Sequence, residues 1–343
     1  SSSLSETLFV AKRSDSHSES EETVFIVLLK KPLIAWESEK LAEKVIEASR
    51  EMSPGDSRTV TAGRTEAYLF KVDRKTLLEN VVNWNVFVAT SDQYLFKTVE
   101  SLVTKGEILA GGRSTGVKVP IARLGELSER IGINRSQFND SFRVVQSETA
   151  YPIVYSGKEE VRSKIAVKPN SHAEPKTDKA DSMFKSFAGR ILVPDIIWWN
   201  TTHATALYSA TPTLSNLFYA VKLKARKISE LAEKALVLWL NTTWGILTML
   251  AYREETRGAL TELKTSQWVL FPVLDVLRLD SATLDRLADV FDRYADKPLR
   301  RIPEQFNPEN PDPARLSIDV EFLKALNPSL DDAELEKALK DLY

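Results

Sequence analysis

The stretch KALVLWLNTTWGILTMLAYR (residues 234–253) organises the sequence, and EETRG (254–258) and LTELKTSQWVLFPVLD (260–275) follow it. Apolar side chains in the first part recur every three or four residues, which predicts one long helix that is buried on most sides. Its length of about 20 residues is enough to cross a bilayer. The polar run Asn241-Thr242-Thr243 in its middle favours a core helix instead.

A charged loop with one glycine follows this helix. Arg253, Thr256 and Arg257 are too polar to pack in a core. Gly258 permits a positive φ or the close approach of a ligand to the backbone. Two interpretations stay open: a solvated helix C-terminus with glycine as its cap, or a binding loop.

The helix, the polar loop and the run that closes at Pro272 together resemble the target-recognition domain of prokaryotic N6-adenine DNA methyltransferases of the restriction-modification or phage-defence type. The resemblance covers most of the chain, but this helix–loop–strand element is its only specific part. Other stretches that resemble the family are SETLFVAKR (5–13) with VFIVLLKKP (24–32), VPIARLGEL (119–127), GINRSQF (132–138), LVPD (192–195) through LSNLFYAV (214–221), and ARLSIDVEFLKAL (314–326).

The expected fold class is α+β: a mixed-sheet recognition domain with a long buried helix, plus a small helical C-terminal tail. Residues 1–52, a β-hairpin and a helix, resemble the end of a methyltransferase catalytic domain. Residues 53–275 form the DNA target-recognition domain, and 276–343 form the tail. Strands are expected at 6–12, 23–30, 68–72 and 217–224, short antiparallel strands within 142–167, loops at 105–116 and 168–178, and helices at 36–50, 93–103, 120–134, 179–188, 281–296, 314–326 and 332–342.

Composition excludes several kinds of site. The 343 residues include no cysteine, so disulfides, cysteine zinc sites and thiol nucleophiles are excluded. His17, His172 and His203 lie too far apart in sequence to match a metal-ligand motif, so no metal site is expected. The first residues lack the basic start and apolar run of a signal peptide, and we expect a cytoplasmic protein that does not enter the membrane.

Charge is distributed unevenly along the chain. The net charge is −2, but residues 105–168 carry 11 Lys or Arg against 7 Asp or Glu, and residues 275–343 carry 10 against 16. A basic middle and an acidic tail would suit one DNA-facing surface and one facing away. Ordinary solvated charge accounts for the imbalance equally well.

Three short stretches contain residue types that can bind nucleotides or bases. The glycine-rich stretch 105–116 matches neither phosphate-cradle pattern, so no nucleotide site is expected there. Arg135 and Gln137 are side-chain types that pair with guanine or adenine edges, although surface charge is the simpler explanation. Of Trp198 and Trp199, which could stack on bases, we expect one in the core and one at a partly exposed surface.

The catalytic motifs of adenine methylation are absent. The reaction needs a glycine-rich loop for S-adenosylmethionine and an Asn/Asp-Pro-Pro-aromatic motif for the flipped adenine. The nearest strings, beginning at Asn307, Asp312 and Asn327, do not match. The resemblance therefore implies the recognition half alone, with no catalytic residue and no cofactor in this chain. S-adenosylmethionine would belong to a separate catalytic domain or subunit.

The first hypothesis is therefore DNA target recognition for an adenine-specific methyltransferase, with double-stranded DNA and the catalytic domain as partners. The alternative is a protein-interaction scaffold without DNA affinity, which the net charge and the acidic tail favour. A complete enzyme of an unrecognised kind is a third possibility. The DNA-binding candidates are Arg253, Thr256, Arg257, Gly258 and Lys264 around the loop, with Lys222, Lys224, Arg113, Lys118, Arg123, Arg135 and Gln137 as outer contacts.

Overall fold

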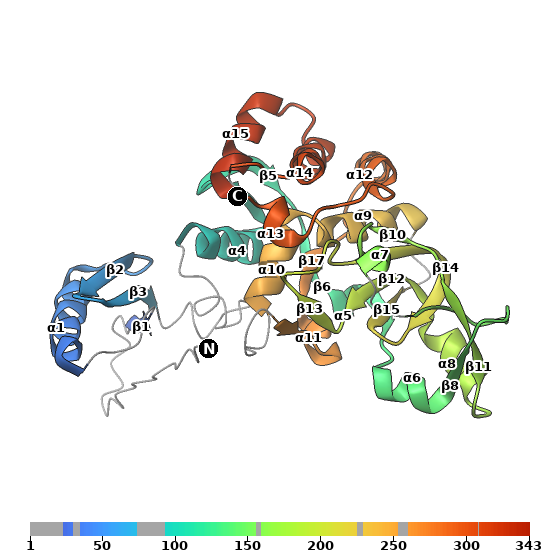
Figure 1. Cartoon of the computed structure of the whole chain (residues 1–343). Coiled ribbons are helices and arrows are strands. Elements are labelled where there is room, and N and C mark those ends of the chain that lie inside the picture. Colours follow the sequence, from blue (N-terminus) through green and yellow to red (C-terminus); the bar gives the residue numbers. More distant parts are fainter. Residues whose placement is uncertain are drawn as a thin grey trace, which may run out of the picture. The chain divides into compact units, whose positions relative to one another are not determined.

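The computed structural model describes residues 23–29, 35–73, 93–155, 159–224, 229–252, 260–307 and 309–343. The chain divides into two compact units, Ser1–Phe96 and Lys97–Tyr343 (Figure 1). The fold class is α+β, as the sequence predicted. The predicted domain boundaries after residues 52 and 275 fall inside the first and the second unit, respectively.

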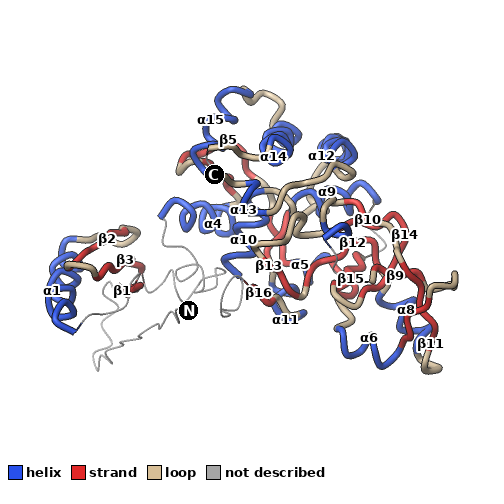
Figure 2. Tube along the Cα trace, in the orientation of Figure 1, coloured by secondary structure: helices blue, strands red, loops and turns tan. Residues whose placement is uncertain are grey.

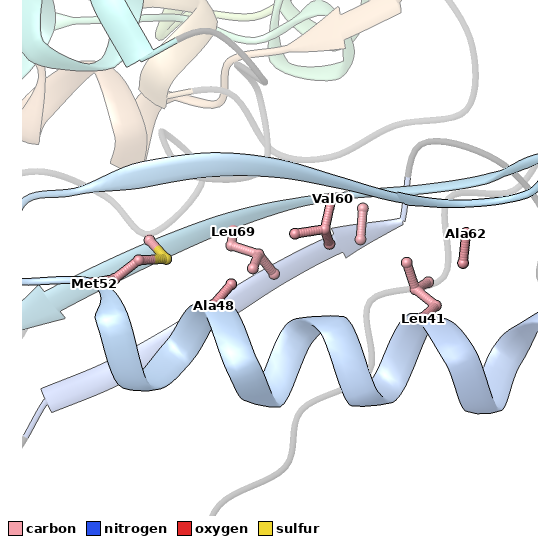
Figure 3. Packing of buried hydrophobic residues seen from close by; sticks show 7 residues of the cluster. Leu41, Ala48, Met52, Val60, Ala62 and Leu69 are labelled. Atoms are coloured by element: carbon pink, nitrogen blue, oxygen red, sulfur yellow. The ribbon is translucent and has the colours of Figure 1, made fainter.

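The first unit is a small sheet covered by one helix. Strands β1 (Thr23–Leu29), β3 (Thr65–Asp73) and β2 (Ser57–Ala62) form an antiparallel sheet in the order β1-β3-β2. Helix α1 (Ala35–Glu51) lies along it, and its residue Leu41 belongs to the same apolar core as Val60 and Leu69 (Figure 3). The predicted strand at 23–30 and helix at 36–50 are confirmed. The other half of the predicted hairpin, 6–12, lies outside the described residues, and β1 pairs with β3.

The second unit is built on an eight-stranded mixed sheet (Figure 2). Two of its inner strands, β12 (Gly189–Pro194) and β15 (Phe218–Leu223), are buried along most of their length, as expected of strands covered on both faces. Helix α9 (Glu230–Leu240) packs against β12 and β14 (Leu207–Ser215), and helix α8 (Ala180–Phe187) packs against β7 (Ser128–Ile131) and β15. The strands run in the order β7 (Ser128–Ile131), β15 (Phe218–Leu223), β12 (Gly189–Pro194), β14 (Leu207–Ser215), β9 (Pro152–Val154), β11 (Ser171–Pro175) and β8 (Phe142–Val145), with β10 (Ala166–Val167) pairing with β14.

The predicted single helix at 234–253 is wrong: it is two helices, α9 (Glu230–Leu240) and α10 (Thr243–Tyr252), which meet at a bend of 68°. The buried Asn241 lies at the break. Its carboxamide accepts the Thr205 backbone N–H at 2.9 Å and donates to the Ala206 carbonyl at 2.8 Å. Polar side chains that bond outside the helix compete with its backbone ladder, which explains why the helix ends here.

A glycine allows the two helices to meet closely. A Cβ built on Gly245, in the first turn of α10, would lie 2.3 Å from the Trp239 carbonyl oxygen of α9. Helix α10 is almost wholly buried, and α9 is fully buried from Ala235 to its end. Among the described residues no single helix is long and apolar enough to cross a membrane, and α9 and α10 pass that test only as a bent pair.

The helical C-terminal region is part of the second compact unit. Helix α12 (Ser281–Tyr294) packs on α9, and α14 (Pro313–Leu326) packs on α12. The buried Arg315 and Asp319 of α14 bond to the chain at the α9–α10 break, and α15 (Asp332–Leu342) packs on α14. The short α13 (Ile302–Gln305) lies between α12 and α14 in sequence. The predicted helices in this region are confirmed.

Long-range strand pairing overrides local periodicity at 120–134, where a helix was predicted. The segment forms β6 (Ile121–Arg123), α5 (Leu124–Leu127) and β7. Strand β6 pairs with β17 (Pro272–Leu274), and β7 pairs with β15. Bonding to these distant strands stabilises the extended backbone more than an isolated amphipathic helix would.

Two predicted loops contain strands. The stretch 105–116 includes β4 (Glu107–Ala110) and the start of β5 (Arg113–Lys118), joined by Gly111 and Gly112 with φ of 54° and 74°. Positive φ at both central residues is the geometry of a tight hairpin turn. The stretch 168–178 contains β11, whose pairing with β8 the local sequence did not reveal.

Candidate nucleic-acid interface

Eight of the twelve DNA-binding candidates lie in the described part of the chain. Arg253, Thr256, Arg257 and Gly258 fall outside it, between Tyr252 at the end of α10 and Leu260 at the start of β16 (Leu260–Glu262). The eight described residues divide into separate groups by the helices and strands that carry them.

The first group surrounds α5 and α11 (Thr265–Leu270), two short helices that pack together (Figure 1). Arg123 is the N-cap residue of α5, and Lys264 is the N-cap residue of α11; both side chains are exposed. Lys224 is also exposed, and its Nζ donates to the Glu126 carbonyl of α5 at 2.6 Å. Three predicted cations therefore come from distant parts of the sequence to one pair of helices.

Arg135 and Gln137 lie in the first turn of α6 (Arg135–Ser141). The Gln137 side-chain oxygen accepts the Asn134 backbone N–H at 3.0 Å, and the Asn134 side chain accepts the Gln137 N–H at 2.9 Å. This reciprocal pair is a capping box. Gln137 therefore has a structural role at the start of α6, while the Arg135 side chain is exposed.

Asp195, between β12 and β13 (Ile196–Trp198), connects these groups. Burial raises the pKa of the Asp195 carboxyl, and backbone N–H groups followed by the charges of Arg162 and Arg135 act in the opposite direction. Burial also raises the pKa of the nearby Tyr219 phenol, to which the Asp195 charge adds and which the Lys264 charge opposes. The charge of Arg135 in α6 thus acts on Asp195, and the charge of Lys264, the N-cap residue of α11, acts on Tyr219.

The remaining cations have other surroundings. Arg113 lines a cavity of about 390 Å³ together with Glu334 and Asp341 of the acidic C-terminal helix α15. Lys118 lies opposite Glu107 in the β4–β5 hairpin. Lys222 is half-buried, and its Nζ donates to the Lys185 carbonyl at 3.1 Å. The structure therefore does not gather Arg113, Lys118 and Lys222 with the cations around α5 and α11.

The tryptophan pair divides between core and surface, as expected. Trp199 is buried, and its Nε1 donates to the Thr261 hydroxyl at 2.7 Å. Trp198 is 53% exposed and lies opposite Leu260 in the β13–β16 ribbon. Val269 and Leu270 of α11 are also exposed, at 41% and 53%. Exposed cations and an exposed tryptophan thus occur on neighbouring elements of this part of the unit.

The sequence did not single out Asp195, Tyr219 or Arg162. The available signal was an acidic residue between two apolar strand-like runs, at LVPD and IIWW. A carboxylate in such a place is costly to bury unless it has charged or hydrogen-bonding neighbours. That rule would have marked Asp195, but only the folded chain shows which cations approach it.

No protein-family model matches the chain, and no curated protein matches it at a significant level. The chemistry of the exposed side chains is therefore the evidence for what this surface can bind. Solvent-exposed lysine and arginine side chains bind phosphate oxygens, and an exposed indole stacks on bases.

Proposed function

We propose that this chain is the DNA target-recognition module of a prokaryotic N6-adenine DNA methyltransferase of a restriction-modification or phage-defence system. It holds duplex DNA for a separate cytoplasmic catalytic domain or subunit, which carries S-adenosylmethionine and transfers the methyl group. The resemblance of the 234–275 stretch to that family supplies the reaction.

The observation that carries the DNA-binding part is the grouping of exposed cations around α5 and α11. Arg123, Lys224 and Lys264 lie at these two helices, and Arg135 is exposed in the first turn of α6. Cations gathered on one surface neutralise adjacent phosphates and release counterions, which supplies most of the affinity for duplex DNA. The net charge of −2 does not oppose this, because residues 275–343 carry 10 Lys or Arg against 16 Asp or Glu, while the rest of the chain carries 36 against 32.

The chain itself supplies matched control residues. Arg113 and Lys118 are exposed like Arg135 and Lys264, but they lie on the β4–β5 hairpin beside acidic residues. In fluorescence anisotropy with a labelled duplex, Arg135→Ala and Lys264→Ala should each weaken binding and reduce the salt slope by about 1. Arg113→Ala and Lys118→Ala should leave both quantities near the wild-type values. Equal effects of the four substitutions would contradict the proposed surface.

A protein-interaction scaffold is the second candidate function. The exposed Val269 and Leu270 side chains on α11 favour it, because contiguous exposed apolar groups often mark protein contacts. A scaffold would show no duplex binding at low salt. For such a scaffold, the double substitution Val269→Ser with Leu270→Ser would abolish binding of the partner protein, and neither the variant nor the wild-type chain would bind duplex DNA.

A further inference from the structure

Two exposed apolar side chains lie next to each other at the end of α11. Val269 is 41% exposed and Leu270 is 53% exposed, whereas the residues on either side of them, Trp268 and Phe271, are fully buried. The Trp268 indole N–H donates to the Pro194 carbonyl at 2.9 Å, and the centroids of the Trp268 and Phe271 rings lie 4.8 Å apart. Two buried aromatic side chains therefore hold this apolar pair in a fixed position at the surface.

The apolar pair lies against α5, which has an exposed cation at each end. A Cβ built on Gly125 in α5 would lie 2.8 Å from a methyl carbon of Val269, so the two helices are in close contact here. Arg123 is the N-cap residue of α5. At the other end, the Lys224 backbone N–H donates to the carbonyl of Leu127, the last residue of α5, at 3.1 Å. An exposed apolar centre and two exposed cations therefore belong to one surface.

The chemistry of this surface fits duplex DNA better than a protein partner. Lysine is depleted in protein–protein contacts. Proteins that bind the minor groove combine cations on the backbone with an apolar side chain, often leucine, that inserts between two base pairs and kinks the duplex by about 20–90°. A duplex offers both partners at once, because its phosphates lie outside and its apolar base faces are stacked within.

We propose that Leu270 enters the minor groove and inserts between two base pairs, with Arg123 and Lys224 on nearby phosphates, so that binding bends the duplex. The inference rests on the proposed function and names how the same surface contacts DNA. Pyrimidine–purine steps such as TA are the easiest to unstack. The insertion therefore also predicts a preference for duplexes with such a step at the bound site.

The competing explanation is that Val269 and Leu270 contact a partner protein, as the scaffold function requires. In that case Leu270 would have no influence on the shape of a bound duplex. The exposed carboxylate of α5, that of Glu126, does not decide between the two explanations. Its side chain accepts the Arg123 backbone N–H at 3.3 Å and so has a structural role at the start of α5.

The test is the bend of a short duplex that carries a donor and an acceptor fluorophore at its two ends, measured in saturating protein at low salt. The wild-type chain should increase the energy transfer between the ends, and Leu270→Ala should remove that increase. Its salt slope should equal that of the wild type, because Leu270 neutralises no phosphate. Leu270→Met keeps a long apolar side chain and should retain the bend.

A second measurement compares the affinities for a duplex with a central TA step and for a duplex with a stiff A-tract. The wild-type chain should bind the first roughly 5-fold or more tightly, since the A-tract costs more to deform. Leu270→Ala should reduce this ratio to about 1. Arg123→Ala should reduce the salt slope by about 1.

Ile46→Ala is the control, because Ile46 on α1 is 52% exposed and thus matches Leu270. Its energy transfer should equal that of the wild type. Duplex binding without a bend, or with a bend that Leu270→Ala retains, would overturn this inference and leave the proposed function standing. No binding of any duplex by the wild-type chain, alone or with a catalytic domain, would overturn both proposals.

Discussion

The carboxylate of Asp319 in α14 caps the first turn of α10 through Thr243: it accepts the Thr243 backbone N–H at 2.9 Å and also the Thr243 hydroxyl. Tyr343 donates its hydroxyl to the same carboxylate at 2.7 Å. One turn earlier in α14, Arg315 donates to the Asn241 carbonyl at the end of α9. The C-terminal helices thus hold both sides of the break between α9 and α10.

Removing the Asp319 carboxylate should strongly destabilise the second unit. Asp319 and Arg315 are fully buried, so Asp319→Ala would leave a buried guanidinium without its counter-charge, at a cost of about 3–5 kcal/mol. Asp332→Ala is the control, because it breaks an exposed pair with Lys324 that is worth about 1 kcal/mol or less. Urea unfolding followed by tryptophan fluorescence measures both. A similar small loss for the two variants would refute the role assigned to Asp319.

Gly245→Ala should prevent the close contact between α9 and α10. The added methyl would lie 2.3 Å from the Trp239 carbonyl oxygen, a backbone atom in a buried helix. We expect a loss of about 1–3 kcal/mol, as for other overpacked cores. Gly116→Ala is the control: it has room for a Cβ but a φ of 74°, so its cost, about 1 kcal/mol, is conformational only. A smaller loss for Gly245→Ala than for Gly116→Ala would contradict the packing argument.

Tyr208→Phe should change the alkaline limb of the stability curve. Burial, with the charges of Glu230 and Glu233, raises the pKa of the Tyr208 phenol from 10.0 to about 12. Because the folded chain holds this proton more tightly, the stability from Tyr208 is complete below pH 10 and is lost as the pH rises to about 12.

The Tyr208→Phe variant should lose less stability than the wild type between pH 10 and 12. At neutral pH it should be within about 1 kcal/mol of the wild type, since among the described residues the buried hydroxyl has no hydrogen-bond partner. Chemical unfolding at a series of pH values measures this. Parallel curves for the two proteins through pH 12 would show that the phenol is not buried as described.

Local sequence patterns predicted the helices and strands that are determined by residues close together in the sequence. Helix α12 has a buried stripe that includes Leu287, Val290 and Phe291, and Asp280 caps it with a bond to the Thr283 N–H. The sequence predicted this helix at 281–296, two residues beyond its observed end at Tyr294. Helix α8 and strand β15 were also predicted within two residues. In each, periodicity and end signals agree with the tertiary environment.

The features missed are those that distant residues decide. The break at Asn241 depends on partners at Thr205 and Ala206, and the cap of α10 on Asp319, 76 residues from Thr243. Strand β6 exists because Pro272–Leu274 lies beside it. In the candidate interface, lysine and arginine were recognisable as residue types. Which of them share a surface follows only from the packing of α5 on α11 and from the position of Asp195.

Arg257→Ala should weaken duplex binding more than an arginine substitution in the acidic region 275–343. One arginine of this region, Arg286 in α12, does not serve as the control. Its guanidinium donates to the Ala325 carbonyl and the Thr283 hydroxyl and so supports the fold. The exposed Arg278 is the better control. A positive charge in the polar loop 253–258 should contribute one phosphate contact, so Arg257→Ala should reduce the salt slope by about 1. Equal affinities for Arg257→Ala and Arg278→Ala would exclude the loop from the interface.

The central claim is that this chain binds duplex DNA through clustered cations. The most direct measurement is a fluorescence-anisotropy titration of the wild-type chain with a labelled random duplex at several salt concentrations. We predict that log affinity falls linearly with log salt, with a slope that corresponds to about five phosphate contacts. Absence of binding at low salt, both for the chain alone and after addition of an adenine-methyltransferase catalytic domain, would contradict the claim and favour the scaffold.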